Sequence, residues 1–402
     1  MIISVSGLPG SGKSTLISNI ISTNASLTQA KIKKEDDFQL IKLFKKVFGA
    51  TLSEQYNFIR QGKVKTSLLI IPFLVDLLYP LVVYIEYLSF YFWYEILFPQ
   101  SILITDRYAY DYFVTAKHNL KIFANPLCSL LYNFPRPSIA FYISADPEWA
   151  LKNRQDRSLN KLNGTAEFLI SLHETYMSIV KRHDLIVLGP GLNAKESVKM
   201  ANFYIALRHR FEKISSVALI GMDGTGKSTV AMSLIANLKS VSLNGKVLHF
   251  FHDSLLNKLI VHLPFAGDKM SQKIGKAISK HGNMFWAIGN FIDGLIQIGI
   301  TRLLHPNSLI VYDRYFYDFL VTFSFYDIPY RELFAKFIPY TDVQVLFVGS
   351  PILSRKRKPE NSVNNYKILQ TLYLNMAREY KINTLAIADF TPQQIVEEII
   401  NV

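Results

Sequence analysis

The chain has 402 residues, half of them apolar, which is enough for two domains of ordinary size with buried cores. This composition excludes an intrinsically disordered chain. The single cysteine, Cys128, excludes an intramolecular disulfide framework and predicts a reducing, cytoplasmic location. Of the net charge of +13, residues up to Lys213 carry 25 − 17 = +8 and the remainder carry 19 − 14 = +5. Such a shared charge suits an anionic ligand. No nucleic-acid-binding signature accompanies it, so no nucleic-acid partner is expected.

The first expected element is a strand over Ile2–Ser6 that leads into a glycine-rich loop and a helix. The loop from Gly7 to Ser14 reads GLPGSGKS and fits the pattern GxxxxGK[ST]. Glycines let backbone N–H groups turn toward phosphate oxygens at a helix N-terminus. Lys13 is predicted to reach the β- and γ-phosphates of ATP, and Ser14 to place its hydroxyl on Mg²⁺. The residues predicted to bind the nucleotide are Gly7, Gly10, Gly12, Lys13, Ser14 and Thr15.

A weak strand is expected near Ala30–Lys33, followed by a long apolar stretch from Ser67 to Phe98. The stretch is long enough to span a bilayer. However, Pro72 and Pro80 interrupt it, and Asp76 would cost about 2.5–3.5 kcal/mol near the bilayer centre. The preferred interpretation is therefore a set of buried helices. A spanning helix, and a peripheral contact with a lipid surface, remain alternatives.

The next expected strand, Ser101–Thr105, is followed directly by Asp106 and Arg107. A carboxylate at this strand end lies beside the phosphate loop, so Asp106 is predicted to hold a Mg²⁺-bound water or to orient the acceptor. Arg107 is predicted to stabilise an anionic acceptor or the charge on the transferring phosphoryl group. A salt bridge at the strand end is the alternative interpretation.

Strands are expected over Ser138–Ser144 and Leu185–Leu188, with a final helix over Ala194–Glu212. Between the two strands, Arg154 and Arg157 follow a helix start at Pro147. The phosphate loop has only one basic residue, so further positive charge must come from elsewhere, and a closing lid that carries these arginines is predicted. A solvated basic surface is the alternative.

The second half repeats these signals in the same order. The segment MIISVSGLPGSGKST is echoed at an offset of 227 − 13 = 214, and PQSILITDRYAYDYFVT at an offset of 313 − 106 = 207. The chain is therefore predicted to be α/β, with two tandem P-loop kinase domains over residues 1–212 and 213–402, each a parallel sheet flanked by helices. The strands expected in the second half are Val217–Ile220, Val247–Phe251, Leu309–Tyr312, Gln344–Val348 and Thr384–Ala388.

The second half carries the same predicted site residues. Its nucleotide-binding set is Gly221, Gly224, Gly226, Lys227, Ser228 and Thr229. Ser228 and Asp313 are predicted to hold Mg²⁺, and Arg314 takes the place of Arg107. Arg355 and Arg357 follow Pro351 in the predicted lid.

A phosphate loop, a strand followed by DRY, and a basic lid together resemble the thymidylate kinases and the wider group of nucleoside and nucleotide kinases. The second half is the closer match, because GMDGTGKST carries Asp223 within the loop and LIVYDRY resembles the family pattern. The resemblance implies that Asp223 contacts the acceptor sugar. It also implies a homodimer-like packing through helices, so the two halves are expected to form an intramolecular pseudo-dimer.

The chain departs from the family at several acceptor positions. Counting back 20 residues from each DRY aspartate gives Glu86 and Asp293, where thymidylate kinases usually carry a thymine-reading arginine. An ionised carboxylate cannot donate a hydrogen bond to a thymine carbonyl, so the acceptor is left open. Both halves share further residues after DRY that are candidates for an acceptor site, with a helix-start carboxylate as the alternative for the aspartates. These residues are Tyr110, Asp111, Tyr317 and Asp318.

The sequence therefore predicts transfer of the γ-phosphoryl group of ATP, with Mg²⁺, to a small acceptor. A nucleoside monophosphate or a nucleoside is the preferred acceptor class. Two alternatives remain: a nucleotide-binding switch or scaffold with slow hydrolysis, and a membrane-anchored protein that presents a kinase-like domain.

Overall fold

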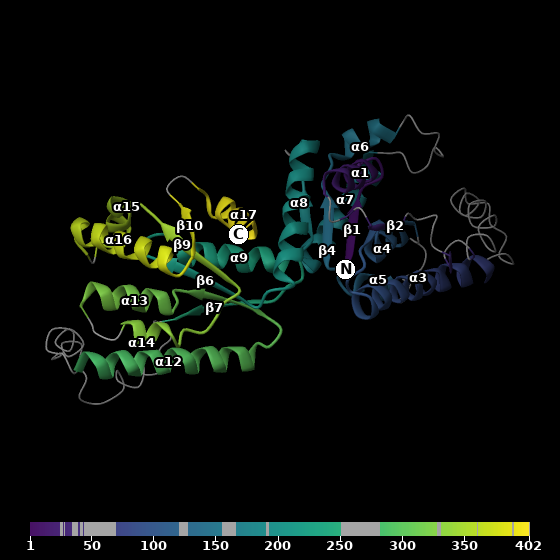
Figure 1. The fold of residues 1–402 in the computed structure, drawn as a ribbon. Coiled ribbons are helices and arrows are strands. Elements are labelled where there is room, and N and C mark those ends of the chain that lie inside the picture. The colour runs from purple at the N-terminus through teal and green to yellow at the C-terminus, as the bar shows by residue number, and fades with distance from the viewer. Residues whose placement is uncertain are drawn as a thin grey trace, which may run out of the picture. The chain divides into compact units, whose positions relative to one another are not determined.

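The computed structural model describes residues 1–24, 27, 29–33, 39, 40, 43, 70–119, 128–154, 166–189, 193–250, 282–327, 331–359, 361–387 and 390–401. These residues form two compact units. Unit 1 comprises Met1–Ile205 with Ser240–Ser242, and unit 2 comprises Ala206–Lys239 with Leu243–Val402. Each described unit contains a five-stranded, all-parallel sheet flanked by helices (Figure 1). The predicted α/β class, with a parallel sheet flanked by helices in each half of the chain, is confirmed.

The first unit contains every strand expected from the sequence. Its strands are β1 (Ile2–Gly7), β2 (Lys31–Lys33), β3 (Leu103–Asp106), β4 (Ile139–Ile143) and β5 (Ile186–Leu188). Its helices are α1 (Lys13–Thr23), α3 (Ile70–Tyr91) with the π-helical turn η4 (Phe92–Leu97), α4 (Ala109–Asn119), α5 (Cys128–Tyr132), α6 (Pro147–Arg154), α7 (Ala166–His183) and α8 (Ala194–Phe211), whose last turns belong to unit 2.

The second unit repeats this series. Its strands are β6 (Ser216–Gly221), β7 (Gly245–His249), β8 (Leu309–Asp313), β9 (Val343–Val348) and β10 (Asn383–Ala386). Its helices are α9 (Lys227–Ser240), α12 (Gly282–Leu304), α13 (Phe316–Phe325), α14 (Arg331–Ala335), α15 (Pro351–Arg357), α16 (Val363–Glu379) and α17 (Pro392–Asn401).

The two sheets have the same topology. The strand orders are β2-β3-β1-β4-β5 and β10-β9-β6-β8-β7, and the second is the first read backwards when the strands are numbered within their own half. The registers also agree: Asp106 pairs with Val5 in unit 1, and Asp313 pairs with Leu219 in unit 2. The central strands are fully buried, as expected of parallel strands covered on both faces. The duplication seen in the motifs therefore extends to backbone pairing.

The apolar helices before each DRY sequence are buried on one face only. On α12, the buried face includes Asn290, Asp293 and Gln297, whereas Ile292 and Leu295 are 50% and 39% exposed. The prediction that these helices are buried is therefore wrong for their outer face. The apolar run gave no periodicity from which the exposed side could be assigned. Among the residues that the structure describes, no helix is long and apolar enough to cross a membrane.

Candidate active sites

Each phosphate loop joins the central strand of its sheet to a helix. Helix α1 begins at Lys13 and α9 at Lys227, so each loop precedes a helix N-terminus, where backbone N–H groups favour anions. All six loop glycines adopt positive φ angles: Gly7 153°, Gly10 88°, Gly12 88°, Gly221 140°, Gly224 79° and Gly226 87°. These conformations are unfavourable for side-chain-bearing residues, which explains the glycine at each position.

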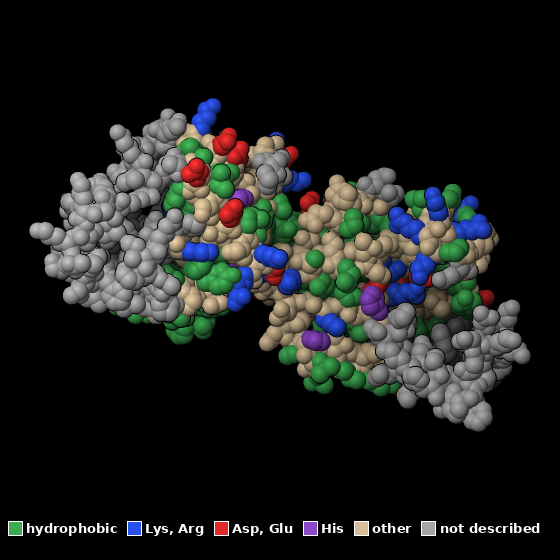
Figure 2. All heavy atoms as spheres, turned by 180° about the vertical axis from the view of Figure 1, so that it is seen from behind, with side chains coloured by type: hydrophobic (Ala, Val, Ile, Leu, Met, Phe, Trp, Pro, Cys, Tyr) green, Lys and Arg blue, Asp and Glu red, His purple; other side chains and the backbone are tan. Residues whose placement is uncertain are grey.

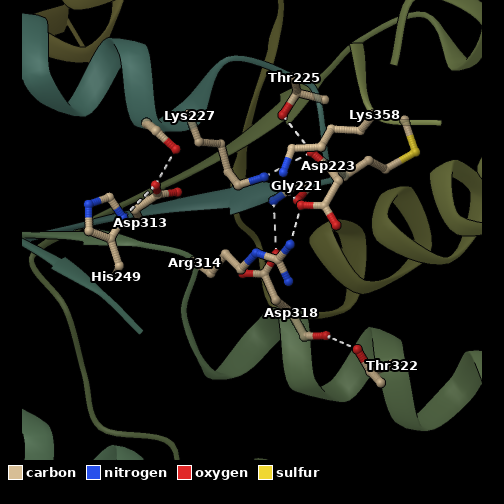
Figure 3. Close-up of polar contacts among 12 residues, drawn as sticks. Gly221, Asp223, Thr225, Lys227, His249, Asp313, Arg314, Asp318, Thr322 and Lys358 are labelled. Atoms are coloured by element: carbon tan, nitrogen blue, oxygen red, sulfur yellow. Dashed lines mark hydrogen bonds and ion pairs between the residues drawn. The ribbon is translucent and has the colours of Figure 1, made fainter. Parts of the chain in front are cut away.

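The lysines and serines of the two loops make equivalent contacts. Lys13 Nζ donates to the carbonyls of Gly7 and Leu8 at 3.0 and 2.9 Å, and Lys227 Nζ donates to those of Gly221 and Met222 at 2.6 and 2.8 Å. Each ammonium is thus held across its own loop, as a phosphate-binding lysine requires. Figure 3 shows this arrangement in unit 2.

In each unit, the serine of the phosphate loop contacts the aspartate that ends the strand next to the central strand. Ser14 Oγ donates to Asp106 Oδ2 at 3.0 Å, and Ser228 Oγ donates to Asp313 Oδ2 at 2.5 Å. Within the described part of the chain, Asp106 Oδ1 is buried without a hydrogen-bond partner. A hydroxyl and a carboxylate beside a phosphate cradle are the oxygen ligands that Mg²⁺ takes, so the residues fit a nucleotide-bound Mg²⁺. No cluster of three His, Cys, Asp or Glu that could hold a metal occurs among the described residues.

The arginines after these aspartates have strained backbones. Arg107 has φ = 91° and Arg314 has φ = 73°, while their N–H groups donate to Val5 and Leu219. A left-handed conformation in a residue with a side chain costs roughly 1–3 kcal/mol, and such strain concentrates at functional sites. The same unusual conformation at the same position in both units supports a site role for the two arginines.

The loop aspartate distinguishes the second site from the first. Asp223 forms an ion pair with Arg314, and both side chains are about one-third exposed. Burial alone would raise the pKa of Asp223, but Arg314 and Lys227 hold it below its ordinary value. Burial alone would lower the pKa of Arg314, but Asp223 and Asp318 raise it. Unit 1 has Pro9 at this position of its loop, so it has no equivalent pair.

Each loop borders a pocket. In unit 2 the pocket has a volume of about 680 Å³ and extends from the phosphate loop past Arg357 to Phe390 and Pro392 at the start of α17. In unit 1 it has a volume of about 1100 Å³ and extends past Trp149 to Asn193 and the start of α8. All the predicted nucleotide-binding loop residues line these pockets except Gly7 and Gly221, the last residues of β1 and β6.

The predicted lid lies directly against the loop of unit 2. Arg357 Nη1 donates to the carbonyl of Gly224 at 3.1 Å, and Arg355 lies exposed on the same helix. Figure 2 shows lysine and arginine side chains gathered over the region of α15 and α16. In unit 1, Arg154 is the last residue of α6, and its side chain and Arg157 lie outside the described residues.

A glycine pair in the second loop provides a prediction with a built-in control. A Cβ at Gly224 would lie 2.7 Å from the backbone oxygen of Ser354 on the lid helix, whereas a Cβ at Gly226 would meet nothing within 4 Å. Both Gly→Ala substitutions force a left-handed alanine, at about 1–2 kcal/mol. Gly224→Ala should lose roughly 1–3 kcal/mol more, because the lid must shift. Thermal unfolding without nucleotide checks this, and equal losses for Gly224→Ala and Gly226→Ala would contradict the lid contact.

The aspartates and tyrosines after DRY lie in the cores. Asp318 accepts hydrogen bonds from the N–H groups of Gly221 and Tyr315 and from the Tyr373 hydroxyl at 3.2, 2.8 and 2.8 Å. Asp111 accepts corresponding bonds from Tyr108 and Tyr176, and from the hydroxyl of Ser6. These contacts match the alternative interpretation of a helix-start carboxylate.

The other proposed acceptor residues also lie away from the described pocket linings. Tyr110 is fully buried and stacks on His183, and Tyr317 packs against Tyr380. Glu86 and Asp293 are buried on α3 and α12. Asp293 accepts a 2.6 Å hydrogen bond from the side chain of Gln297. Their predicted role in acceptor binding therefore stays a prediction.

One site residue was not predicted. His249 lines the pocket of unit 2, and its Nδ1 lies 3.0 Å from Asp313 Oδ2. His249 ends β7 and pairs in register with Asp313 at the end of β8. The available signal was a polar residue at the end of the strand after the phosphate-loop helix, where parallel strand ends meet.

Comparisons with known proteins give matches among solved structures only. No family model and no curated protein matches the sequence. Matching solved structures include a deoxyadenosine kinase from M. mycoides with dCMP and a flexible dCDP bound. It aligns with 50% of this chain and 96% of its own, at 17% identity and a TM-score of 0.30.

Proposed function

We propose that both halves bind ATP with Mg²⁺ and that the protein transfers the γ-phosphoryl group to a small acceptor, a nucleoside monophosphate or a nucleoside. The observation that carries the proposal is the repeated set of lysine, serine, aspartate and arginine. The set forms twice, in the same sheet register and beside a pocket. One constellation present in both halves is poorly explained by glycine-rich turns that bind nothing.

The residues of each site have separable tasks in this proposal. The loop N–H groups and Lys227 hold the phosphates, so the γ-phosphorus is fixed before an acceptor arrives. Arg314 and the lid residue Arg357 place positive charge where negative charge develops on the transferring group. Mg²⁺, when bound with the nucleotide, would neutralise charge between the β- and γ-phosphates. Ser228 and Asp313 are the residues that would hold it.

The acceptor oxygen attacks the γ-phosphorus, the bond from that phosphorus to the β,γ-bridging oxygen breaks, and ADP leaves. In this proposal, Asp223 and Arg314 select the acceptor at the second site. Asp223 is ionised, so it can accept a hydrogen bond from a sugar hydroxyl. Arg314 can pair with a phosphate of the acceptor.

The test is incubation of the full chain with ATP labelled at the γ-phosphate, Mg²⁺, and a panel of nucleosides, nucleoside monophosphates and sugars. We expect one acceptor class to become labelled. Asp313→Asn and Asp106→Asn show which half works, because each should lower labelling by about 10²-fold or more at its own site. Release of inorganic phosphate with every acceptor unlabelled would contradict the proposal and favour a nucleotide-binding switch.

A further inference from the structure

The two units differ at the strand next to the aspartate strand. In unit 2, β7 ends at His249, which pairs in register with Asp313. In unit 1, β2 ends at Lys33, which pairs with Thr105, one residue before Asp106. The next residue in the sequence is Lys34, which lies outside the described residues. No histidine occurs among the residues known to line the pocket of unit 1.

Two side chains, those of Ser228 and His249, contact one carboxylate oxygen of Asp313 in unit 2. Asp313 Oδ2 lies 2.5 Å from Ser228 Oγ and 3.0 Å from His249 Nδ1 (Figure 3). The Asp313 side chain is 7% exposed, whereas the His249 side chain is 43% exposed and borders the pocket. The imidazole therefore faces the space in which the phosphates and their cation are expected.

This spacing suits ligands of one ion. Protein nitrogen and oxygen ligands lie about 2.0–2.2 Å from a divalent transition metal, so two ligands at a right angle are about 3 Å apart. The separation between His249 Nδ1 and Asp313 Oδ2 has this value. Nδ1 would bind the ion through its lone pair, with the proton of the neutral ring on Nε2. Ion binding would move the ring proton to Nε2 and replace the hydrogen bond from Ser228 Oγ to Asp313 Oδ2 by bonds to the ion.

The chemistry of imidazole then determines the ion. Mg²⁺ takes oxygen ligands almost exclusively, whereas Mn²⁺, Co²⁺ and Zn²⁺ accept imidazole nitrogen. A site with a hydroxyl, a carboxylate and an imidazole should therefore discriminate against Mg²⁺ relative to a site with oxygen ligands alone.

We propose that His249 is a third protein ligand of the divalent cation at the second site, which therefore prefers a transition-metal ion such as Mn²⁺ over Mg²⁺. The first site, without a described counterpart of His249, shows no such preference. The inference rests on the proposed nucleotide site. It adds to that site a residue and a cation class that make the two halves different.

The experiment uses the full chain with Mn²⁺ and a non-hydrolysable β,γ-imido analogue of ATP, observed by electron spin echo envelope modulation. The Lys13→Ala variant confines nucleotide to the second site, and Lys227→Ala confines it to the first. We expect ¹⁴N modulation from a directly bound imidazole in Lys13→Ala and none in Lys227→Ala. Adding His249→Ala to the Lys13→Ala background should abolish the modulation and reduce the preference for Mn²⁺ over Mg²⁺ by about tenfold or more.

The variant His249→Gln separates ligation from positioning. Glutamine can still donate a hydrogen bond to Asp313 but has no imidazole nitrogen, so the ¹⁴N signal should be lost in this variant as well. Nucleotide and Mn²⁺ bound at the second site without imidazole modulation, or modulation that survives His249→Ala, would overturn the assignment of His249. Absence of nucleotide binding in Lys13→Ala would instead overturn the nucleotide site of this half, and the ligand proposal with it.

Discussion

Replacing Lys227 by alanine is expected to lower phosphoryl transfer at the second site by about 10²–10³-fold. Lys227 is 5% exposed, and its ammonium is held across the loop by two carbonyls, so its position is fixed before substrate binds. Burial lowers the pKa of Lys227, although Asp318 partly opposes this. The positive charge of Lys227 is therefore only partly balanced by neighbouring negative charge in the free site. A phosphate oxygen would balance the remainder. Single-turnover kinetics with the acceptor identified in the panel measures the effect.

The matched control is Lys239→Ala, which removes the same charge from the exposed last turn of the same helix. Its rate should stay within about twofold of the wild-type rate, because surface charges away from a site contribute little. Lys13→Ala should give the corresponding loss at the first site only. Equal losses for Lys227→Ala and Lys239→Ala would show that the net charge of the helix matters, and would contradict a positioned phosphate ligand.

Replacing Asp318 by alanine is expected to destabilise unit 2 by about 3–5 kcal/mol. Asp318 is 2% exposed, and its carboxylate accepts hydrogen bonds from a strand N–H, a helix-start N–H and the Tyr373 hydroxyl. Burial raises the pKa of Asp318, and the nearby positive charges of Lys227 and Arg314 partly offset this rise. Removing the side chain leaves three buried donors unpaired beside two cations. The free energy of unfolding of unit 2 should fall, whereas that of unit 1 should not.

A graded series checks the cause of this loss. Tyr373→Phe removes one donor without leaving a backbone group unpaired, and should cost about 1.5–3 kcal/mol, as for a hydrogen bond to a charged group. Thr322→Val removes a hydroxyl that donates to a carbonyl of its own helix, and should have little effect. Hydrogen exchange of β6 and α13 gives the local free energies. Unchanged protection in Asp318→Ala would contradict a structural role for this carboxylate.

The geometry of both phosphate loops could be predicted because its information is local. The loop from Gly7 to Ser14 carries its own turn chemistry, and the helix after it follows directly. Asp106 and Asp313 were placed correctly because each ends an apolar strand, and parallel strands bring their carboxyl ends to one edge of a sheet. Even the weak strand near Ala30–Lys33 was found, since its counterpart in the second half is clear.

Other parts of the sites depend on contacts that local sequence does not encode. Asp318 bonds to Gly221 across 97 residues, so a helix-start aspartate could not be told from an acceptor ligand. His249 reaches Asp313 through strand pairing across 64 residues, and no spacing rule links a single histidine to a distant aspartate. The exposed face of α12 was missed because an almost uniformly apolar helix gives the same pattern whether it is covered or not.

The number of nucleotides bound per chain tests the central claim most directly. Equilibrium dialysis with the β,γ-imido analogue of ATP and Mg²⁺ should give two per wild-type chain. Lys13→Ala and Lys227→Ala should each give one, and the double variant none, provided that all four proteins have the same helical content by circular dichroism. A wild-type value of zero, or a value that neither lysine variant changes, would contradict two phosphate-binding sites in one chain.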